Sequence, residues 1–310
     1  MVNGNPDDGS TAIKHIRGDI CDCRPGDSAF NESSCIVIAD MRLVLLILIL
    51  FLYVSAPGQV PMNNTQTPDQ PAPRTDQNSI IAHQELLEKR KKGRIDIYFA
   101  GDSITRRWGT SDEQYKHFYE NWRQNFFGWN AANFGWGGDT TQNILWRLHN
   151  GELDEVNPKV IVLLAGTNNI GNKPPEGDDD PRIEGVTRGI KAILDTFRRK
   201  APNATIILMG IFPRNDNIEV MRIINPINLR VAKFADGKKI RFVNINHKLA
   251  DKDGKLFEGM SKDGLHLEVK SYQVWADALK PIFTELLGPP SKEDHAPPPT
   301  GDPSQRRPKN

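Results

Sequence analysis

Cysteine is scarce in this 310-residue chain, and its three copies, Cys21, Cys23 and Cys35, all lie within the first forty positions. The remainder of the sequence therefore offers neither a disulfide nor a thiol nucleophile. The pair Cys21-x-Cys23 supplies only two ligands at close spacing, which is a weak pattern for a metal site. The cysteine content thus directs the search for chemistry toward oxygen and nitrogen groups.

Charge of one sign is also lacking. The chain carries 40 Lys and Arg against 39 Asp and Glu, a formal charge of +1. This balance gives no electrostatic reason to expect a nucleic acid or an anionic membrane as partner.

Several familiar motifs are missing as well. The sequence has no Gly-x-Ser-x-Gly nucleophile elbow and no phosphate-binding P-loop, and Thr140 stands where a dinucleotide-binding glycine motif at Gly135 and Gly137 would need its third glycine. The acidic loop 176–180 is a candidate for Ca²⁺, although a solvated loop explains it better. We expect no metal and no organic cofactor.

One apolar run stands out, from Leu43 to Val54, preceded by Met41 and Arg42. A short basic start, an apolar stretch and a small-residue end are typical of a secretory signal peptide. The run is too short for a spanning helix, which needs about 20 apolar residues. We therefore expect residues 41–58 to be a signal peptide, cleaved near Gly58, and the product to be secreted (extracellular or periplasmic) without stable membrane association.

Residues 1–40 precede this segment and show no clean periodicity. We interpret them as a doubtful N-terminal extension that reflects a mis-assigned start, and the alternative is a cytoplasmic extension ahead of a signal anchor. Residues 59–78, rich in Pro, Gln, Asn and Thr, predict a flexible linker. The Pro-rich residues 289–310 predict a disordered tail. A single domain over 79–288 remains.

Strands and helices alternate within this domain. Alternation over five strands predicts a three-layer α/β/α, flavodoxin-like domain with a five-stranded parallel sheet. Ligands of such a domain bind beyond the carboxyl ends of the strands. The expected strands are 95–101, 129–135, 159–166, 204–211 and 240–245, and the expected helices are about 112–126, 140–150, 183–200, 217–236 and 269–287. Capping boxes are expected at Ser111 with Gln114 and at Asp139 with Gln142.

Four short polar segments follow strands or precede the last helix, and they are residues 101–104, 133–140, 166–169 and 263–266. An acyl-transfer site needs a nucleophile, a base, a group that orients the base, and donors for the oxyanion. Ser103 supplies the hydroxyl, His266 can act as base, and Asp263 can hold the imidazole. The Gly138 and Ser103 N–H groups and the Asn168 amide are candidate oxyanion donors.

The order Ser, Gly, Asn and a closing Asp-x-x-His resembles the four blocks of the SGNH (GDSL-like) hydrolases over residues 95–287. The phrase NFGWGGDTTQNILWRL at 133–148 is especially similar to the branch that contains the platelet-activating-factor acetylhydrolase catalytic subunits and many bacterial carbohydrate acetylesterases. The resemblance implies the triad Ser103, Asp263 and His266, with Ser103, Gly138 and Asn168 as the oxyanion hole.

Three further residues are candidates for substrate binding. Asp102 and Asn169 neighbour the catalytic candidates, and which of the amides of Asn168 and Asn169 faces the site stays open. Trp136 is a candidate for the acyl pocket or for stacking on a sugar ring, and a buried structural tryptophan is the equally good alternative.

These observations predict a secreted serine esterase that hydrolyses short-chain acetyl esters through an acyl-Ser103 intermediate, with acetylated carbohydrate as the expected substrate. A phospholipid-type acetylhydrolase or lysophospholipase and an O-acetyltransferase with the same triad are the alternatives. A carbohydrate-binding module without chemistry is disfavoured, because all the reactive residues are present. The sequence leaves the oligomeric state open.

Overall fold

A computed structural model describes residues 67–306 of the chain. The predicted N-terminal extension at 1–40, the predicted signal peptide at 41–58 and the first part of the predicted linker lie outside the described residues. They stay predictions.

The centre of the structure is a five-stranded, wholly parallel sheet, which confirms the predicted α/β architecture. The strands follow the spatial order β2-β1-β3-β4-β5. Apolar and β-branched side chains fill the central strands because helices cover both faces of the sheet. The strands are β1 (Ile97–Gly101), β2 (Ala131–Asn133), β3 (Val160–Leu164), β4 (Thr205–Met209) and β5 (Ile240–Val243).

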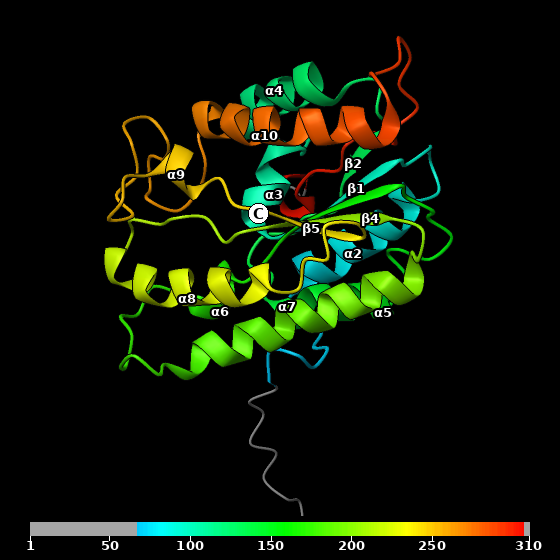
Figure 1. The fold of residues 1–310 in the computed structure, drawn as a ribbon. Coiled ribbons are helices and arrows are strands. Elements are labelled where there is room, and N and C mark those ends of the chain that lie inside the picture. The colour runs from blue at the N-terminus through cyan, green and yellow to red at the C-terminus, as the bar shows by residue number, and fades with distance from the viewer. Residues whose placement is uncertain (1–66, 307–310) are drawn as a thin grey trace, which may run out of the picture. The chain divides into compact units, whose positions relative to one another are not determined.

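Two layers of helices enclose the sheet, one on each face (Figure 1). On one face, Tyr98 and Ile161 contribute to a core shared with α2, α5, α7 and α8. On the other, Phe99 and Val162 pack with α3, α4, α9 and α10. The helices are α2 (Gln77–Lys89), α3 (Ser103–Trp108), α4 (Lys116–Phe126), α5 (Thr141–His149), α6 (Thr167–Ile170), α7 (Pro181–Lys200), α8 (Met221–Ala232), α9 (Asn246–Leu249) and α10 (Val269–Leu287).

The five predicted helices are confirmed, with short 3₁₀ turns before α4 and α8, but α2, α3, α6 and α9 were not predicted. Both predicted capping boxes are wrong. The box at α5 is formed by Thr140 and Asn143, one residue later than expected. Asp112 precedes the turn before α4 without a side-chain cap. Among residues 67–306, no helix is long and apolar enough to cross a bilayer.

The C-terminal tail differs from its prediction, since residues 289–306 lie against the domain instead of being disordered. The His295 carbonyl accepts from the Arg94 N–H at 2.8 Å, and the Thr300 carbonyl accepts from the Ser111 N–H at 3.2 Å. Asp294 accepts from the Gly128 N–H at 2.6 Å. A proline-rich segment cannot bury a regular apolar face, but here the domain's own polar groups satisfy its backbone.

The predicted linker is also wrong over its described part. Residues 67–76, which we call the N-terminal strap, cross the start of α5. Ala72 exchanges backbone and side-chain hydrogen bonds there, donating to the Gln142 carbonyl at 3.1 Å and accepting from Asn143 Nδ2 at 3.0 Å. Asp76 then caps α2 by accepting from the Ser79 N–H. The domain therefore extends over 67–306 on both sides of the predicted 79–288.

Candidate active site

Ser103 is the first residue of α3, directly after β1, and its side chain meets a histidine from the other end of the domain. Ser103 Oγ lies 3.0 Å from His266 Nε2, and His266 Nδ1 lies 2.7 Å from Asp263 Oδ2. The structure therefore brings the three predicted triad residues into one hydrogen-bonded chain across 163 residues of sequence. A hydroxyl, an imidazole and a carboxylate in this order can generate a nucleophilic oxygen.

The loop that carries the histidine is shaped by Asp263 itself. Asp263 Oδ1 accepts from the N–H groups of Leu265 and His266 at 2.9 and 2.7 Å, while Oδ2 faces the imidazole. Gly264 between them has φ of +78°, and a Cβ there would lie 2.5 Å from the Asp216 nitrogen. Only glycine fits this turn, which explains why the carboxylate and the imidazole stand three residues apart.

The environment keeps the imidazole neutral and the carboxylate charged. Burial lowers the pKa of His266 below 6.5, assisted by the cations of Arg107 and Arg214, although Asp263 acts in the opposite direction. Burial opposes ionisation of Asp263, but the hydrogen bonds from His266 and from the Leu265 N–H outweigh it, so its pKa falls well below 3.8. A neutral base beside an ionised carboxylate is the state that can accept the Ser103 proton.

The predicted oxyanion donors lie on two adjacent loops. Asn168, in α6 after β3, donates from Nδ2 to the Asp139 carbonyl at 2.8 Å, which leaves its second amide hydrogen for another acceptor. Gly138 has φ of +77°, which favours glycine. None of the hydrogen bonds within residues 67–306 uses the Gly138 N–H. The loop is held beside the nucleophile because the Trp136 N–H donates to the Gly101 carbonyl at 3.1 Å.

The structure answers which of the two neighbouring amides is free. Asn169 accepts from the Thr141 N–H at 2.9 Å and donates to Gln142 Oε1 at 2.7 Å. Its side chain therefore holds the start of α5, and the prediction of a substrate contact for Asn169 is wrong. Asn168 is the amide of the pair that keeps a spare donor.

The other two substrate-binding candidates are buried. Trp136 is 7% exposed, donates from Nε1 to Ser79 Oγ at 2.8 Å and packs against the Arg106 guanidinium. It is the structural tryptophan of the alternative reading, not a sugar-stacking surface. Asp102 is fully buried and caps α3 by accepting from the Ile104 N–H at 2.9 Å, so it supports the nucleophile from below. Burial raises the pKa of Asp102 to about 7.

Sequence reasoning missed Arg214, which joins the two halves of the site. This buried side chain donates to the Thr167 carbonyl at 3.1 Å and pairs with Asp216. The next residue, Asn215, donates from its N–H to the Gly264 carbonyl at 2.6 Å. The loop after β4 thus fixes both the segment that carries the free amide and the turn that carries the triad histidine. A Pro-Arg-Asn-Asp run after a predicted strand was the available signal.

Groups that could hold a metal ion were sought over residues 67–306, and no set of three His, Cys, Asp or Glu side chains forms one there. In the acidic loop, Asp180 pairs with Arg182 and accepts from the Glu176 N–H at 3.0 Å. That carboxylate is therefore occupied by internal partners.

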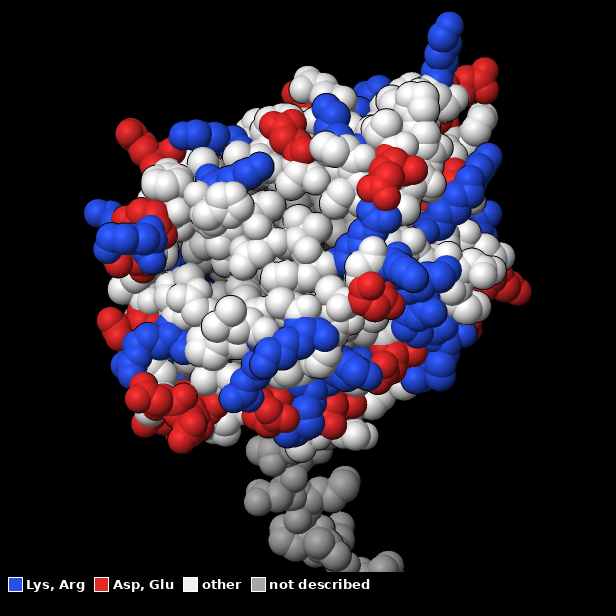
Figure 2. Space-filling view, viewed as in Figure 1, with Lys and Arg blue, Asp and Glu red and all other residues white. Residues whose placement is uncertain are grey.

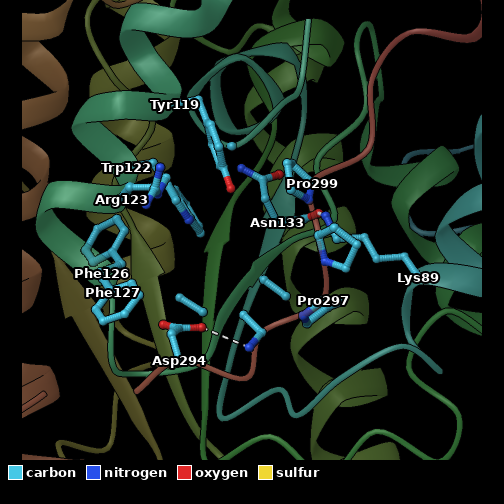
Figure 3. A pocket seen from close by; sticks show the side chains of 15 residues that line it. Lys89, Tyr119, Trp122, Arg123, Phe126, Phe127, Asn133, Asp294, Pro297 and Pro299 are labelled. Atoms are coloured by element: carbon cyan, nitrogen blue, oxygen red, sulfur yellow. Dashed lines mark hydrogen bonds between the residues drawn. The ribbon is translucent and has the colours of Figure 1, made fainter. Parts of the chain in front are cut away.

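The surface seen in Figure 2 carries its charged side chains mainly around the margin, and the centre of this face is largely uncharged. A separate small cavity lies at the free edge of β2, between α4 and the tail (Figure 3). Its wall includes Lys89, which is buried, donates to the Asn133 carbonyl at 2.7 Å, and has its pKa lowered to about 7 by burial. This lysine closes the edge of the sheet.

Comparison with known proteins shows relatives of the predicted kind. The chain is 32% identical over 223 residues to the platelet-activating factor acetylhydrolase IB subunit alpha1 of Bos taurus, covering 71% of this chain and 89% of that protein. It is 33% identical over 220 residues to the subunit alpha2 of Homo sapiens, covering 68% and 86%.

Solved structures share the fold at lower identity. One from Streptococcus pneumonia, described as a platelet activating factor, superposes with a TM-score of 0.53 at 21% identity, covering 78% of this chain and 98% of that one. One from Bacteroides fragilis, described as an acylhydrolase, gives 0.52 at 19% identity, covering 68% and 99%.

A family model matches the segment that holds the strand–helix core and the whole hydrogen-bonded chain of Ser103, His266 and Asp263. The matched residues are 99–274, and the family is described as GDSL-like lipase/acylhydrolase. The chain is a carboxylic ester hydrolase and belongs to the GDSL-like lipase/acylhydrolase family.

Proposed function

We propose that the protein hydrolyses small-acyl esters through an acyl-Ser103 intermediate. His266 Nε2 takes the hydroxyl proton as Ser103 Oγ forms a bond to the ester carbonyl carbon. The negative charge on the carbonyl oxygen is stabilised by Asn168 and by the N–H groups of Gly138 and Ser103. His266 then protonates the departing alcohol, and a water molecule activated by the same imidazole releases the carboxylic acid. The 3.0 Å contact between Ser103 and His266 is the observation that carries this proposal.

The decisive variant is Ser103→Ala. It removes the atom that becomes acylated, so hydrolysis of p-nitrophenyl acetate should fall to background while the melting temperature is unchanged. His266→Ala should be almost as damaging. Substantial turnover in a normally folded Ser103→Ala protein would defeat the assignment.

We further propose that the acyl group is acetyl and that the alcohol is a carbohydrate. An acetyl group is the acyl part in the names of the curated relatives. The carbohydrate half rests on the predicted export of the chain, which would place it among extracellular polymers. Trp136 no longer supports it, because its ring is buried.

An acetylated ether phospholipid is the second candidate, since the curated relatives are named for platelet-activating factor. The two candidates are separated by measuring acetate release from acetylated xylan and from the lipid, with Ser103→Ala as the blank. Release from xylan supports the carbohydrate, and release from the lipid alone removes it. Faster turnover of octanoate than of acetate esters would contradict the acetyl preference itself.

We also propose that the protein acts after export and binds neither nucleic acid nor a membrane stably. The near-neutral charge of +1 and the tripartite segment at 41–58 support this proposal.

A further inference from the structure

Arg74, in the N-terminal strap, contacts the loop that carries the candidate oxyanion donor Gly138. Its Nη1 donates to the Gly137 carbonyl at 2.9 Å, across 63 residues of sequence. The same guanidinium lies 3.0 Å from Asp76 and 3.6 Å from Asp139, and the side chain is 32% exposed. A cation thus stands behind the peptide group that joins Gly137 to Gly138.

The geometry of a peptide group links this contact to the oxyanion hole. The Gly137 C=O and the Gly138 N–H belong to one planar trans unit and point in opposite directions. A hydrogen bond that fixes the carbonyl therefore fixes the direction of the N–H. Donation to the carbonyl also polarises the peptide group and strengthens its N–H as a donor.

Little else restrains this peptide. Both residues are glycines, which rotate more freely than any other residue. A Cβ built on Gly137 would meet no atom within 4 Å, so side-chain packing does not wedge this position. A Cβ built on Gly138 would first meet Arg74, with Nη1 at 3.1 Å. The arginine is thus the side chain nearest to the donor residue.

The strap places Arg74 accurately because it is anchored to the helix that follows the same loop. Thr141 Oγ1 donates to the Pro68 carbonyl at 2.7 Å, and Asn143 Nδ2 donates to the Ala72 carbonyl at 3.0 Å. Thr141 and Asn143 lie in the first turn of α5, directly after Gly138. The cation and the glycine loop therefore share one support.

We infer that Arg74 is a positioning residue of the oxyanion hole, which acts by orienting the Gly138 N–H. The inference rests on the proposed function, because an oxyanion forms only if an ester is attacked at this site. It also gives the strap, which sequence composition presents as a linker, a part in the activity.

The experiment compares Arg74→Gln and Arg74→Lys with the unchanged full chain, using p-nitrophenyl acetate. Arg74→Gln should lower kcat roughly tenfold, less than the loss of a whole donor, and leave KM within about twofold. Arg74→Lys, which keeps a cation and a donor, should lie between the two. The matched control is Arg188→Gln, since Arg188 lies 3.6 Å from Asp69 of the same strap and anchors it elsewhere. The control should keep its kcat.

Melting temperatures separate positioning from folding. If Arg74→Gln does not fold, Arg74→Lys carries the test through a kcat roughly threefold lower at constant KM, because a single ammonium reproduces the guanidinium contacts only in part. The inference is overturned if kcat is unchanged, if only KM rises, or if Arg188→Gln loses as much activity as Arg74→Gln. An active Ser103→Ala protein would instead overturn the proposed function.

Discussion

At the scale of single residues, adjacent side chains of the same type have different tasks. Asn168 keeps a free amide hydrogen beside the glycine loop, whereas Asn169 is used on both sides of its amide by the start of α5. The same division separates Asp263, which orients the imidazole, from Asp102, which is buried beneath the nucleophile as a helix cap.

The asparagine pair gives the first prediction. Asn168→Ala should lower kcat roughly 10²–10³-fold with a smaller change in KM, the usual cost of losing one oxyanion donor. Asn169→Ala should instead cost about 1 kcal/mol of stability, because the Thr141 N–H loses its acceptor at the start of a helix. Steady-state kinetics and denaturant unfolding of both variants check this. A rise in KM at constant kcat for Asn168→Ala would make it a ground-state contact.

The pH profile provides the second prediction. The base must be neutral, and the pKa of His266 is lowered from 6.5, so the acid limb of kcat/KM should lie below pH 6.5. Asp263 acts to raise that pKa, so in Asp263→Asn the limb should move further to acid while kcat falls by about 10²-fold or more.

Asp102→Asn is the control for this profile, since asparagine can still cap α3. The pKa of Asp102 is about 7, in the range where a limb could also arise. A limb that is lost in Asp102→Asn and kept in Asp263→Asn would contradict the assignment to His266.

At the scale of elements, the irregular ends of the chain are structural parts of the domain. The tail contacts the loops before β1, before β2 and after α3 through the carbonyls of His295 and Thr300 and the carboxylate of Asp294. It also lines the cavity at the free edge of β2 (Figure 3). Covering a free strand edge in this way prevents pairing with another chain.

The tail gives the third prediction. A chain that ends at Gly288 should be less stable than the full chain by about 2–4 kcal/mol, given roughly 1 kcal/mol for each lost hydrogen bond. Denaturant unfolding measures the difference. A chain that ends at Arg306, lacking only positions outside the described structure, is the control and should unfold like the full chain. Equal midpoints for all three chains would show that the tail contributes nothing.

At the scale of the whole molecule, the open question is where the enzyme works. The apolar run 43–54 lies outside the described residues, and the catalytic domain itself carries no spanning helix within residues 67–306. The location therefore depends on the N-terminal segment alone.

Export provides the fourth prediction. A gene product that begins at Met41 should be secreted and trimmed near Gly58, which N-terminal sequencing of the medium would show. Ile47→Arg places a charge in the apolar run and should block secretion without changing the domain. An untrimmed N-terminus in the membrane fraction would contradict the export proposal.

The sequence by itself determined what depends on neighbouring residues. The buried strand runs predicted the parallel sheet, because a strand covered on both faces must be apolar throughout. Asp263 and His266 could be paired because a three-residue turn brings their side chains together. Ser103 was identifiable from its place after a strand, where the ligands of such a sheet bind.

Only the tertiary structure decided what depends on distant segments. The free amide of Asn168, the burial of Trp136 under Ser79 and the contact of Arg74 with Gly137 each join residues 29 to 63 positions apart. The strap and the tail were misjudged for the same reason, since their backbones are satisfied by the domain and not by local periodic structure. Composition reports the apolar surface that a segment can bury, but not the polar partners that the fold brings to it.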